Sequence, residues 1–208
     1  MKSKSPIAVV FATDNNYLQH LYVALFSLLD NTTERKNLNI YIIDGGIEES
    51  NKREFITFFE KLYKTKILFL EINRDKFREF QISHHIKPVA YYRISIPSLI
   101  PHNIEKAIYL DCDLIVKDDI KKLWEIELDD FWIGAVHNPY SNRLSDLNIS
   151  KDQGYFNSGV MLLNLDLWRK VDISSQILQF IVKNPDKIVL HDQDALNAII
   201  RGNWLKIP

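Results

Sequence analysis

The sequence predicts an α/β protein with a mainly parallel, Rossmann-like sheet flanked by helices. Short apolar runs of strand length alternate with segments whose apolar residues recur at helical spacing, beginning at Ile7 and continuing to Ile72. This alternation indicates parallel strands joined by helical crossovers, with both faces of the sheet covered. Ligands of such sheets gather outside the carboxyl ends of the strands.

The first half of the chain supplies three strands and two helices. Ile7–Ala12 is a continuous apolar run that ends in the polar loop 13–16, and a helix begins at Leu18. The next elements are a strand over Leu38–Asp44, a turn at Gly45 and Gly46, a helix over Glu48–Tyr63 with Phe55, Phe58, Phe59 and Leu62 on its inner face, and a strand over Lys66–Ile72.

The second half begins with a less regular segment, in which Tyr91, Tyr92 and Arg93 fall in a helix that starts near Pro88. The elements expected after it are a strand over Ala107–Val116, a short helix through Lys121–Leu123 capped by Asp118 and Asp119, strands over Phe131–Val136 and Phe156–Asn164, a helix that Asp166 or Asp172 caps and that continues through Ile173–Val182, a helix over His191–Ile200, and a strand beginning at Trp204.

Two carboxylates interrupt the apolar run Ala107–Val116. If the backbone there is extended, Asp111 and Asp113 point to one face and Cys112 to the other. Two like charges held this close favour a cation between them, and hard divalent ions such as Mg²⁺ and Mn²⁺ prefer oxygen ligands. The pair therefore predicts a metal site suited to phosphate chemistry, although two solvated aspartates at a strand end remain an alternative.

Composition narrows the class of protein. The chain has 208 residues, 46% hydrophobic and 25% charged, with a formal net charge of −1. This balance gives no electrostatic footprint for nucleic acid. The sequence holds no apolar run of the length that crosses a bilayer, so we expect at most peripheral membrane contact. A single cysteine fits a reducing, cytoplasmic location, including the inner face of the membrane.

No linker or internal repeat divides the chain, so residues 1–208 are expected to form a single domain. The last residues look like a strand just beginning, and we expect the natural polypeptide to continue. Polar residues from distant segments can meet at one edge of the sheet. They are Asp14 and Asn16 after the first strand, Asn157 at the start of a later strand, and Asp192, Gln193 and Asp194 at the start of a late helix.

Four blocks of this sequence resemble glycosyltransferase family 8, the retaining sugar-nucleotide transferases that include bacterial lipopolysaccharide galactosyltransferases and glycogenin. The blocks cover residues 11–17 (FATDNNY), 108–116 (IYLDCDLIV), 155–164 (YFNSGVMLLN) and 191–197 (HDQDALN). Their order and spacing match over nearly the whole chain. The resemblance implies a GT-A fold, in which an Asp-any-Asp motif holds Mn²⁺, or Mg²⁺, against the diphosphate of a UDP-sugar.

The resemblance also assigns roles to individual residues. Asp14 and Asn16 correspond to contacts with uracil and ribose, Tyr17 to a ring stacked on the base, and Arg93 to a basic group over the sugar and phosphates. Asp111 and Asp113 correspond to the metal ligands. Ala12, Cys112, Asn157, Ser158, Asp192 and Gln193 complete the implied nucleotide-sugar site. Apart from the resemblance, Asp14 and Asn16 fit a turn, Arg93 fits a surface ion pair, and Asp192–Asp194 fit a plain helix start.

The histidines divide into two groups. His20, His84, His85, His102 and His137 are expected to be surface or packing residues, and only His191 lies near the predicted site. In the resembled family the third protein ligand of the metal is a histidine in a C-terminal segment, and no such segment follows Pro208 in this sequence.

The implied reaction is transfer of a hexose, galactose or glucose, from UDP to an acceptor hydroxyl with retention of configuration. A double displacement needs a nucleophilic carboxylate, and Gln193 is an amide, so attack on the face that UDP leaves is favoured. Asp194 is the alternative nucleophile. Acceptors implied by the resemblance are bacterial glycans, lipid-linked saccharides and glycoproteins. Two other classes stay open: a haloacid-dehalogenase-like phosphatase, and a non-catalytic UDP or UDP-sugar binding protein.

Overall fold

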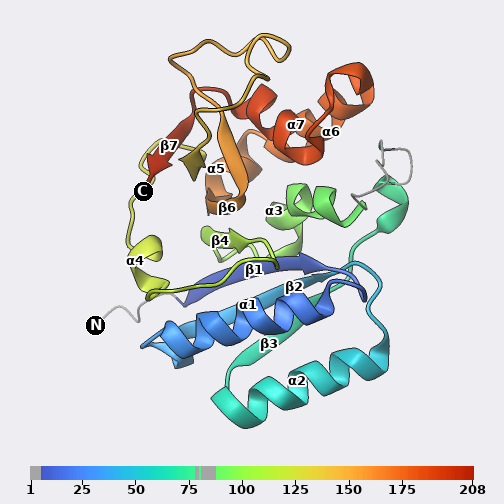
Figure 1. The fold of residues 1–208 in the computed structure, drawn as a ribbon, viewed down its shortest axis with the longest axis vertical. Helices are drawn as coiled ribbons and strands as arrows, with labels where there is room; N and C mark the ends of the chain where they lie inside the picture. Colours follow the sequence, from blue (N-terminus) through green and yellow to red (C-terminus); the bar gives the residue numbers. More distant parts are fainter. Residues whose placement is uncertain (1–5, 78–79, 81–87) are drawn as a thin grey trace.

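The computed structural model describes residues 6–77, 80 and 88–208. His84 and His85 lie outside this part of the chain. Within it, seven strands form one sheet in the order β3-β2-β1-β4-β6-β5-β7 (Figure 1). The strands are β1 (Ile7–Thr13), β2 (Leu38–Asp44), β3 (Lys66–Leu70), β4 (Lys106–Leu110), β5 (Ile133–His137), β6 (Phe156–Asn164) and β7 (Trp204–Ile207).

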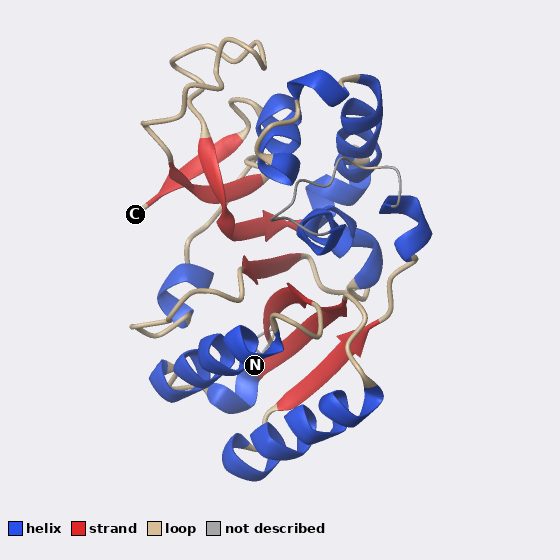
Figure 2. Ribbon diagram, turned by 45° about the vertical axis from the view of Figure 1, so that its right-hand side comes forward, coloured by secondary structure: helices blue, strands red, loops and turns tan. Residues whose placement is uncertain are grey.

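Helices cover both faces of this sheet, as the blue ribbons around the red strands show in Figure 2. They are α1 (Leu18–Asn31), α2 (Glu49–Tyr63), α3 (Ile96–Leu99), α4 (Lys121–Trp124), α5 (Leu165–Lys170), α6 (Ile173–Lys183) and α7 (His191–Ile200), with 3₁₀ helices η1 (Arg35–Asn37), η2 (Arg74–Phe77), η3 (Pro88–Ser95) and η4 (Pro185–Lys187). The predicted α/β class with a mainly parallel sheet is confirmed.

Alternation along β1 builds a separate core on each face of the sheet. Val9 and Phe11 face α1 and α2, while Ala8 and Val10 face the side that carries η3, α3 and α5–α7. Both sets are fully buried. The strand is therefore apolar from Ile7 to Ala12, as expected of a parallel strand covered on both sides.

The predicted bounds of β2, β6 and α7 agree with the structure, and the helix expected near Pro88 is the 3₁₀ helix η3. Of the two candidate caps, Asp172 caps α6 by accepting from Ser175 N, while Asn164 caps α5. Asp119 accepts from Lys121 N at 2.9 Å at the start of α4. Gly46 turns the chain after β2 with φ of 107°, a backbone conformation that favours glycine.

Two local predictions are wrong. The strand expected over Ala107–Val116 ends at Leu110, so Asp111 and Asp113 lie in a turn and not on a strand face. Leu114 and Val116 look like strand residues because they pack against the core from the loop. On α2, Phe55 and Phe59 are buried as predicted, but Phe58 and Leu62 are 44% and 54% exposed, because the buried face of this helix is only two aromatic residues wide.

The direction of β6 decides how the site is assembled. β6 pairs antiparallel with β4, with Leu110 opposite Val160, and it is the one described strand that runs against the others. Its first residues therefore lie beside the carboxyl end of β4. Asn157 and Ser158 reach the predicted edge of the sheet because their strand starts there, not because a parallel strand ends there.

Candidate nucleotide-sugar site

A cleft of about 180 Å³ opens at the carboxyl ends of β1 and β4. These neighbouring strands form the point at which the strand order reverses, since β2 and β3 continue from one side of β1 and β4 lies on the other. Open α/β sheets bind ligands at such switch points. The cleft is lined by Ala12, Thr13, Asp14, Tyr17, Val89, Ala90, Arg93, Tyr109, Asp111, Cys112 and Asp113.

Asp14 organises the loop that leads from β1 into α1. Its Oδ1 accepts from the backbone amides of Asn16 and Tyr17 at 2.9 and 3.0 Å, and Asn16 Nδ2 lies 3.4 Å from Oδ2. The turn role expected for Asp14 and Asn16 is confirmed, while the first helical residue receives no side-chain cap. Tyr17 is 49% exposed at the cleft, and its ring stacks on His20 with centroids 4.6 Å apart.

Arg93 lies at the centre of the site. Its Nη2 is 3.0 Å from Asp111 Oδ1 and its Nε is 3.1 Å from Asp192 Oδ2. Nη1 donates to the carbonyl of Ser158 at 2.7 Å, and the guanidinium lies 4.4 Å from the ring centroid of Tyr109. Burial opposes this charge, but Asp192, Tyr109 and Asp111 together raise the pKa of Arg93. The surface ion pair considered for Arg93 is therefore wrong: its side chain is only 8% exposed.

Asp192 is held behind Arg93 at the first turn of α7. It is 5% exposed and accepts from Ser158 Oγ at 3.3 Å. Burial raises the pKa of this carboxyl from 3.8 to about 6, against the lowering effect of Arg93. Asp192 is thus ionised and paired at neutral pH, but only because the guanidinium lies beside it.

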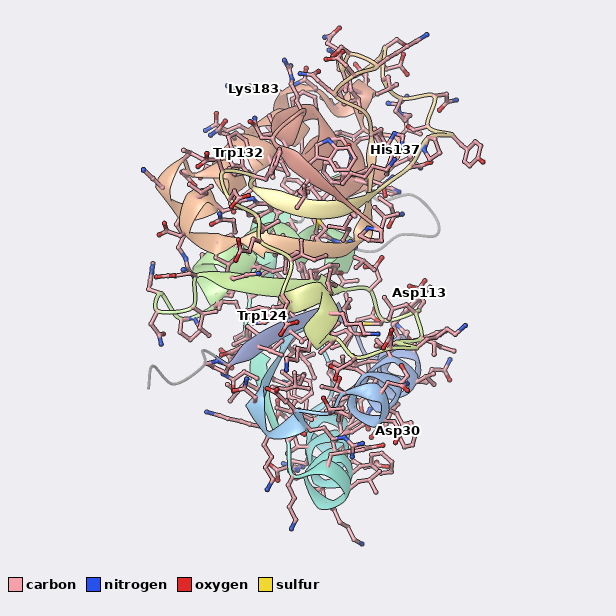
Figure 3. All side chains as sticks on the ribbon, turned by 90° about the vertical axis from the view of Figure 1, so that its left-hand side faces the viewer. Asp30, Asp113, Trp124, Trp132, His137 and Lys183 are labelled. Carbon is pink, nitrogen blue, oxygen red and sulfur yellow. The ribbon has the colours of Figure 1, made fainter. Side chains whose placement is uncertain are left out.

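Asp111 and Asp113 differ in how firmly they are held. Asp111 Oδ1 accepts from Tyr109 Oη at 2.8 Å as well as pairing with Arg93. Asp113 is exposed and, among the described residues, forms no hydrogen bond or ion pair. Figure 3 shows its side chain on the outer side of the loop beyond β4. The two residues supply hard oxygen donors that suit Mn²⁺ or Mg²⁺.

Among the described residues no group of three metal-ligating side chains is present, so the pair offers an incomplete ligand set. His20 and His137 pack against the rings of Tyr17 and Trp204. His191 Nδ1 lies 3.4 Å from the hydroxyl of Tyr91.

The start of β6 contributes Asn157, Ser158 and Gly159. Asn157 is exposed, and its Oδ1 accepts from Gly159 N at 2.8 Å. Gly159 lies directly against the Asp111 carboxylate: a Cβ at this position would lie 2.7 Å from Asp111 Oδ2. Only glycine lets the Asp111 carboxylate keep this position.

Gln193 and Asp194 follow Asp192 on α7 but have different environments. Gln193 is half-buried, and its Oε1 accepts from Ser158 N at 3.1 Å. Asp194 is fully buried and accepts from Tyr155 Oη at 2.7 Å and from the amides of Val189 and Leu190 at 2.9 and 2.7 Å. Arg143 Nε lies 3.3 Å from its Oδ2. None of these partners lines the cleft.

Cys112 lies between the two aspartates, is buried and lines the cleft with them. Its Sγ donates to the carbonyl of Ala12 at 3.3 Å, which ties the β4 turn to the end of β1. Burial raises the pKa of this thiol to about 12. Cys112 therefore joins two walls of the cleft and is not a nucleophile.

Several residues of the site were missed from the sequence. Tyr109 precedes Asp111 by two positions, and the alternation of the strand could have indicated it. Val89 and Ala90 come from η3, and Tyr155 and Arg143 come from the segment between β5 and β6. No local pattern marks Val89, Ala90 and Arg143, whereas Tyr155 opens the block 155–164 and could have been found from it.

The charge of the cleft indicates what it can bind. Among the described lining residues, Asp14, Asp111 and Asp113 carry carboxylates and Arg93 carries a guanidinium. Asp192 lies behind Arg93 and adds a fourth carboxylate. Asp111 and Asp113 by themselves would repel a diphosphate, whereas a divalent ion between these two aspartates would offset their charge.

Comparisons with known proteins give one family. The family model described as "Glycosyl transferase family 8" matches residues 8–208. General stress protein A of Bacillus subtilis is 38% identical over the whole chain, which spans 73% of that protein. The lipopolysaccharide 1,2-glucosyltransferase of Escherichia coli is 27% identical over 96% of the chain and 60% of its own length.

Among solved structures, the galactosyltransferase LgtC in complex with donor and acceptor sugar analogues superposes with a TM-score of 0.88. It is 29% identical and covers 96% of this chain, which spans 73% of LgtC. LgtC has also been solved as an active-site mutant in which a glutamine is replaced by glutamate. The GT-A-like fold is therefore confirmed, and the chain belongs to glycosyl transferase family 8, a family of retaining glycosyltransferases.

Proposed function

We propose that this chain transfers a hexose, galactose or glucose, from UDP to an acceptor hydroxyl with retention of configuration and with a divalent metal. The observation that carries this proposal is the pair Asp111 and Asp113 in the cleft at the β1/β4 switch point, beside Arg93, which is already paired with Asp111 and Asp192. Such a pair suits a nucleoside diphosphate only together with a cation.

The nucleoside part of the donor would lie at the end of β1. Asp14 and Asn16 are fixed there by their own turn, and the exposed ring of Tyr17 offers a face for the base. Ala12 and Cys112 bring the backbones of the two strand ends together at the same point. We assign these five residues to nucleotide contact.

Asp111 and Asp113 would hold Mn²⁺ or Mg²⁺. When bound, the ion supplies positive charge that stabilises the departing UDP. Asp111 is already positioned by Arg93 and Tyr109, whereas Asp113 has no described partner to give up. We expect the third protein ligand from a segment beyond this sequence, and we treat residues 1–208 as one catalytic domain.

The sugar would lie against the start of β6 and the first turn of α7. We assign Arg93, Asp192, Asn157, Ser158 and Gln193 to sugar contact, since Arg93 pairs with Asp192 and Ser158 contacts both Asp192 and Gln193. In the proposed reaction the bond between the anomeric carbon and the UDP oxygen breaks, and UDP keeps its electron pair. The acceptor oxygen bonds to that carbon from the same face, and its proton passes to the leaving phosphate.

Gln193 would stabilise the positive charge that develops on the sugar. The active-site glutamine replaced in the LgtC mutant supports a glutamine at this step. Asp194 is the alternative nucleophile, but its carboxylate accepts hydrogen bonds from four donors inside the protein. A double displacement would have to break this network, so we assign Asp194 to positioning.

The acceptor would be a saccharide on a bacterial glycan, a lipid-linked saccharide or a glycoprotein. Relatives described as a galactosyltransferase and a lipopolysaccharide glucosyltransferase support this class. Within the described residues, no helix is both long and apolar enough to span a membrane. A cytoplasmic location stays a prediction that rests on the single unpaired cysteine.

A thermal-shift panel with UDP, UDP-glucose, UDP-galactose and UDP-N-acetylglucosamine, each with Mn²⁺ or with EDTA, tests this function. A ligand selective for the native state raises the melting temperature by mass action. We expect the largest rise in melting temperature with Mn²⁺ together with UDP-glucose or UDP-galactose. In a separate transfer assay, NMR should then detect a product with retained configuration. Release of phosphate from simple phosphoesters, or UDP binding without transfer in the natural full-length protein, would contradict the proposal.

A further inference from the structure

A chain of hydrogen bonds leads from the segment between β5 and β6 to Gln193. Arg143 Nε lies 3.3 Å from Asp194 Oδ2, and Tyr155 Oη donates to Asp194 Oδ1 at 2.7 Å. Gln193 Nε2 then donates to Tyr155 Oη at 3.2 Å. At its other end, Gln193 Oε1 accepts from Ser158 N at 3.1 Å.

These hydrogen bonds allow the side-chain amide of Gln193 only one orientation. The hydroxyl of Tyr155 has a single proton, and it donates that proton to the Asp194 carboxylate, which pairs with Arg143. Tyr155 can then only accept from Gln193, which requires Nε2 on that side. Ser158 N–H can only donate, which requires Oε1 on the other side. If the amide were flipped, the NH₂ group of Gln193 would face the N–H of Ser158, and both groups are donors.

The groups that set the donor and acceptor roles in these hydrogen bonds are buried. Asp194 is fully buried and Tyr155 is 1% exposed. Burial raises the pKa of Tyr155, which keeps the hydroxyl proton in place for Asp194. Arg143 is 8% exposed, and its Nη2 also donates to the carbonyl of Lys187 at 2.7 Å. The charge that balances Asp194 is therefore itself fixed.

The orientation places an oxygen toward the residues assigned to sugar contact. Oε1 lies on the Ser158 side, and Ser158 contacts both Arg93 and Asp192. Nε2 lies on the opposite side, toward Tyr155 and Asp194. An amide oxygen carries partial negative charge, which stabilises a carbon that becomes positive, whereas an N–H would destabilise it.

We propose that Arg143, Asp194 and Tyr155 form a positioning network that keeps the Gln193 carbonyl oxygen turned toward the reacting sugar. This inference rests on the proposed function, and it adds Arg143 and Tyr155 as positioning residues. Neither residue touches the cleft, so their effect passes through the amide of Gln193.

The test replaces Tyr155 with phenylalanine, which removes the hydroxyl and leaves the Asp194 carboxylate available. Tyr140→Phe is the matched control, since Tyr140 comes from the same segment and is 94% exposed. We expect Tyr155→Phe to lower kcat by ~10- to 100-fold with KM for the donor within about twofold, because only the orientation of a group acting in the transition state is lost. Tyr140→Phe should change neither constant.

A second readout needs no turnover. The side-chain amide protons of Gln193 are assigned in NMR spectra by their loss in Gln193→Ala. They should shift in Tyr155→Phe and stay in place in Tyr140→Phe. If Tyr155→Phe does not fold, the wild-type protein still provides the test: a slowly exchanging Tyr155 hydroxyl proton should show a nuclear Overhauser effect to the Gln193 amide protons.

An unshifted Gln193 amide, a missing Overhauser effect, or an unchanged kcat in Tyr155→Phe would overturn the positioning network. A wild-type protein that shows the NMR signals but transfers no sugar would overturn the proposed function and leave the amide orientation supported. The two failures are therefore distinguishable.

Discussion

Nε of Arg93 lies 3.1 Å from Oδ2 of Asp192, and the two side chains are 8% and 6% exposed. These residues are almost a hundred positions apart in the sequence, on η3 and α7, and their ion pair joins the two helical segments across the site. A buried pair of this kind is costly to break, because the remaining charge has no partner.

The first prediction concerns Arg93→Met, which removes the guanidinium and keeps the apolar stem. At about pH 8 the free energy of unfolding in urea should fall by roughly 3–5 kcal/mol, because Asp192 stays buried without a counter-charge. Adding Asp192→Asn to this variant should recover part of the loss. Equal stability of the single and double variants would show that the pair is not coupled.

The second prediction concerns pH. Burial raises the pKa of Asp192 from 3.8 to about 6, so the folded protein holds this proton more tightly than the unfolded chain. The folded state then binds more protons between about pH 4 and 6, and the free energy of unfolding falls as the pH rises through that window. Above it the contribution of this group is constant.

Urea denaturation of the metal-free protein at a series of pH values measures this effect. The wild type should lose about 3 kcal/mol relative to Asp192→Asn between pH 4 and 7, since that is the free-energy equivalent of the pKa rise. Parallel stability curves for the two proteins would contradict the raised pKa of Asp192.

The third prediction separates the two aspartates of the acidic turn. Asp113→Ala should leave the free energy of unfolding within about 0.5 kcal/mol of wild type, because the side chain is exposed, and it should remove the Mn²⁺ dependence of UDP binding. Asp111→Ala should also destabilise the fold, because Arg93 loses a partner. Calorimetric titration checks binding, with the exposed Asp118→Ala as the control on the same loop.

The fourth prediction uses Gly159, which lies against the Asp111 carboxylate. In Gly159→Ala the new Cβ meets Asp111 Oδ2 at 2.7 Å, so the carboxylate must move although Arg93 and Tyr109 hold its other oxygen. Metal-dependent affinity for UDP should fall about tenfold or more, equivalent to about 1.4 kcal/mol. Gly202→Ala is the control, since its nearest atom is at 3.5 Å. Equal affinities in the two variants would refute the close approach.

The fifth prediction concerns the thiol of Cys112. Its burial and its pKa of about 12 keep the thiol protonated at neutral pH. Alkylation by iodoacetamide should be slow in the folded protein and fast in urea. Rapid alkylation of the native protein would contradict the burial and the raised pKa of this thiol.

The sequence predicts the fold well where one periodicity dominates. β2, β6 and α7 have the expected bounds because each is bordered by turn or capping residues. The strand through Ala107–Val116 is overextended because Leu114 and Val116 are apolar for a different reason: they pack from a loop. The spacing of apolar residues also does not show in which direction a strand runs. The antiparallel orientation of β6 could therefore not be predicted from its residues.

The site likewise contains residues that the sequence predicts and residues that it does not. Asp14, Asp111, Asp113 and Arg93 meet at one cleft, as the motifs imply. The contacts that fix Gln193 and Asp194 are not predictable: Arg143 and Tyr155 lie 51 and 39 positions from Asp194, Arg143 has no recognisable pattern around it, and the block that contains Tyr155 does not name its partner. Only the folded chain shows that the carboxylate of Asp194 is fully engaged.

The central claim is that a divalent cation held by Asp111 and Asp113 binds the diphosphate of a UDP-sugar. Anomalous diffraction at the manganese edge, from crystals soaked with Mn²⁺ and UDP, tests it most directly. We predict one strong peak between the two carboxylates, in contact with the diphosphate and next to Tyr17 and the end of β1. UDP bound at another place, or bound in this cleft without manganese at the acidic pair, would contradict it.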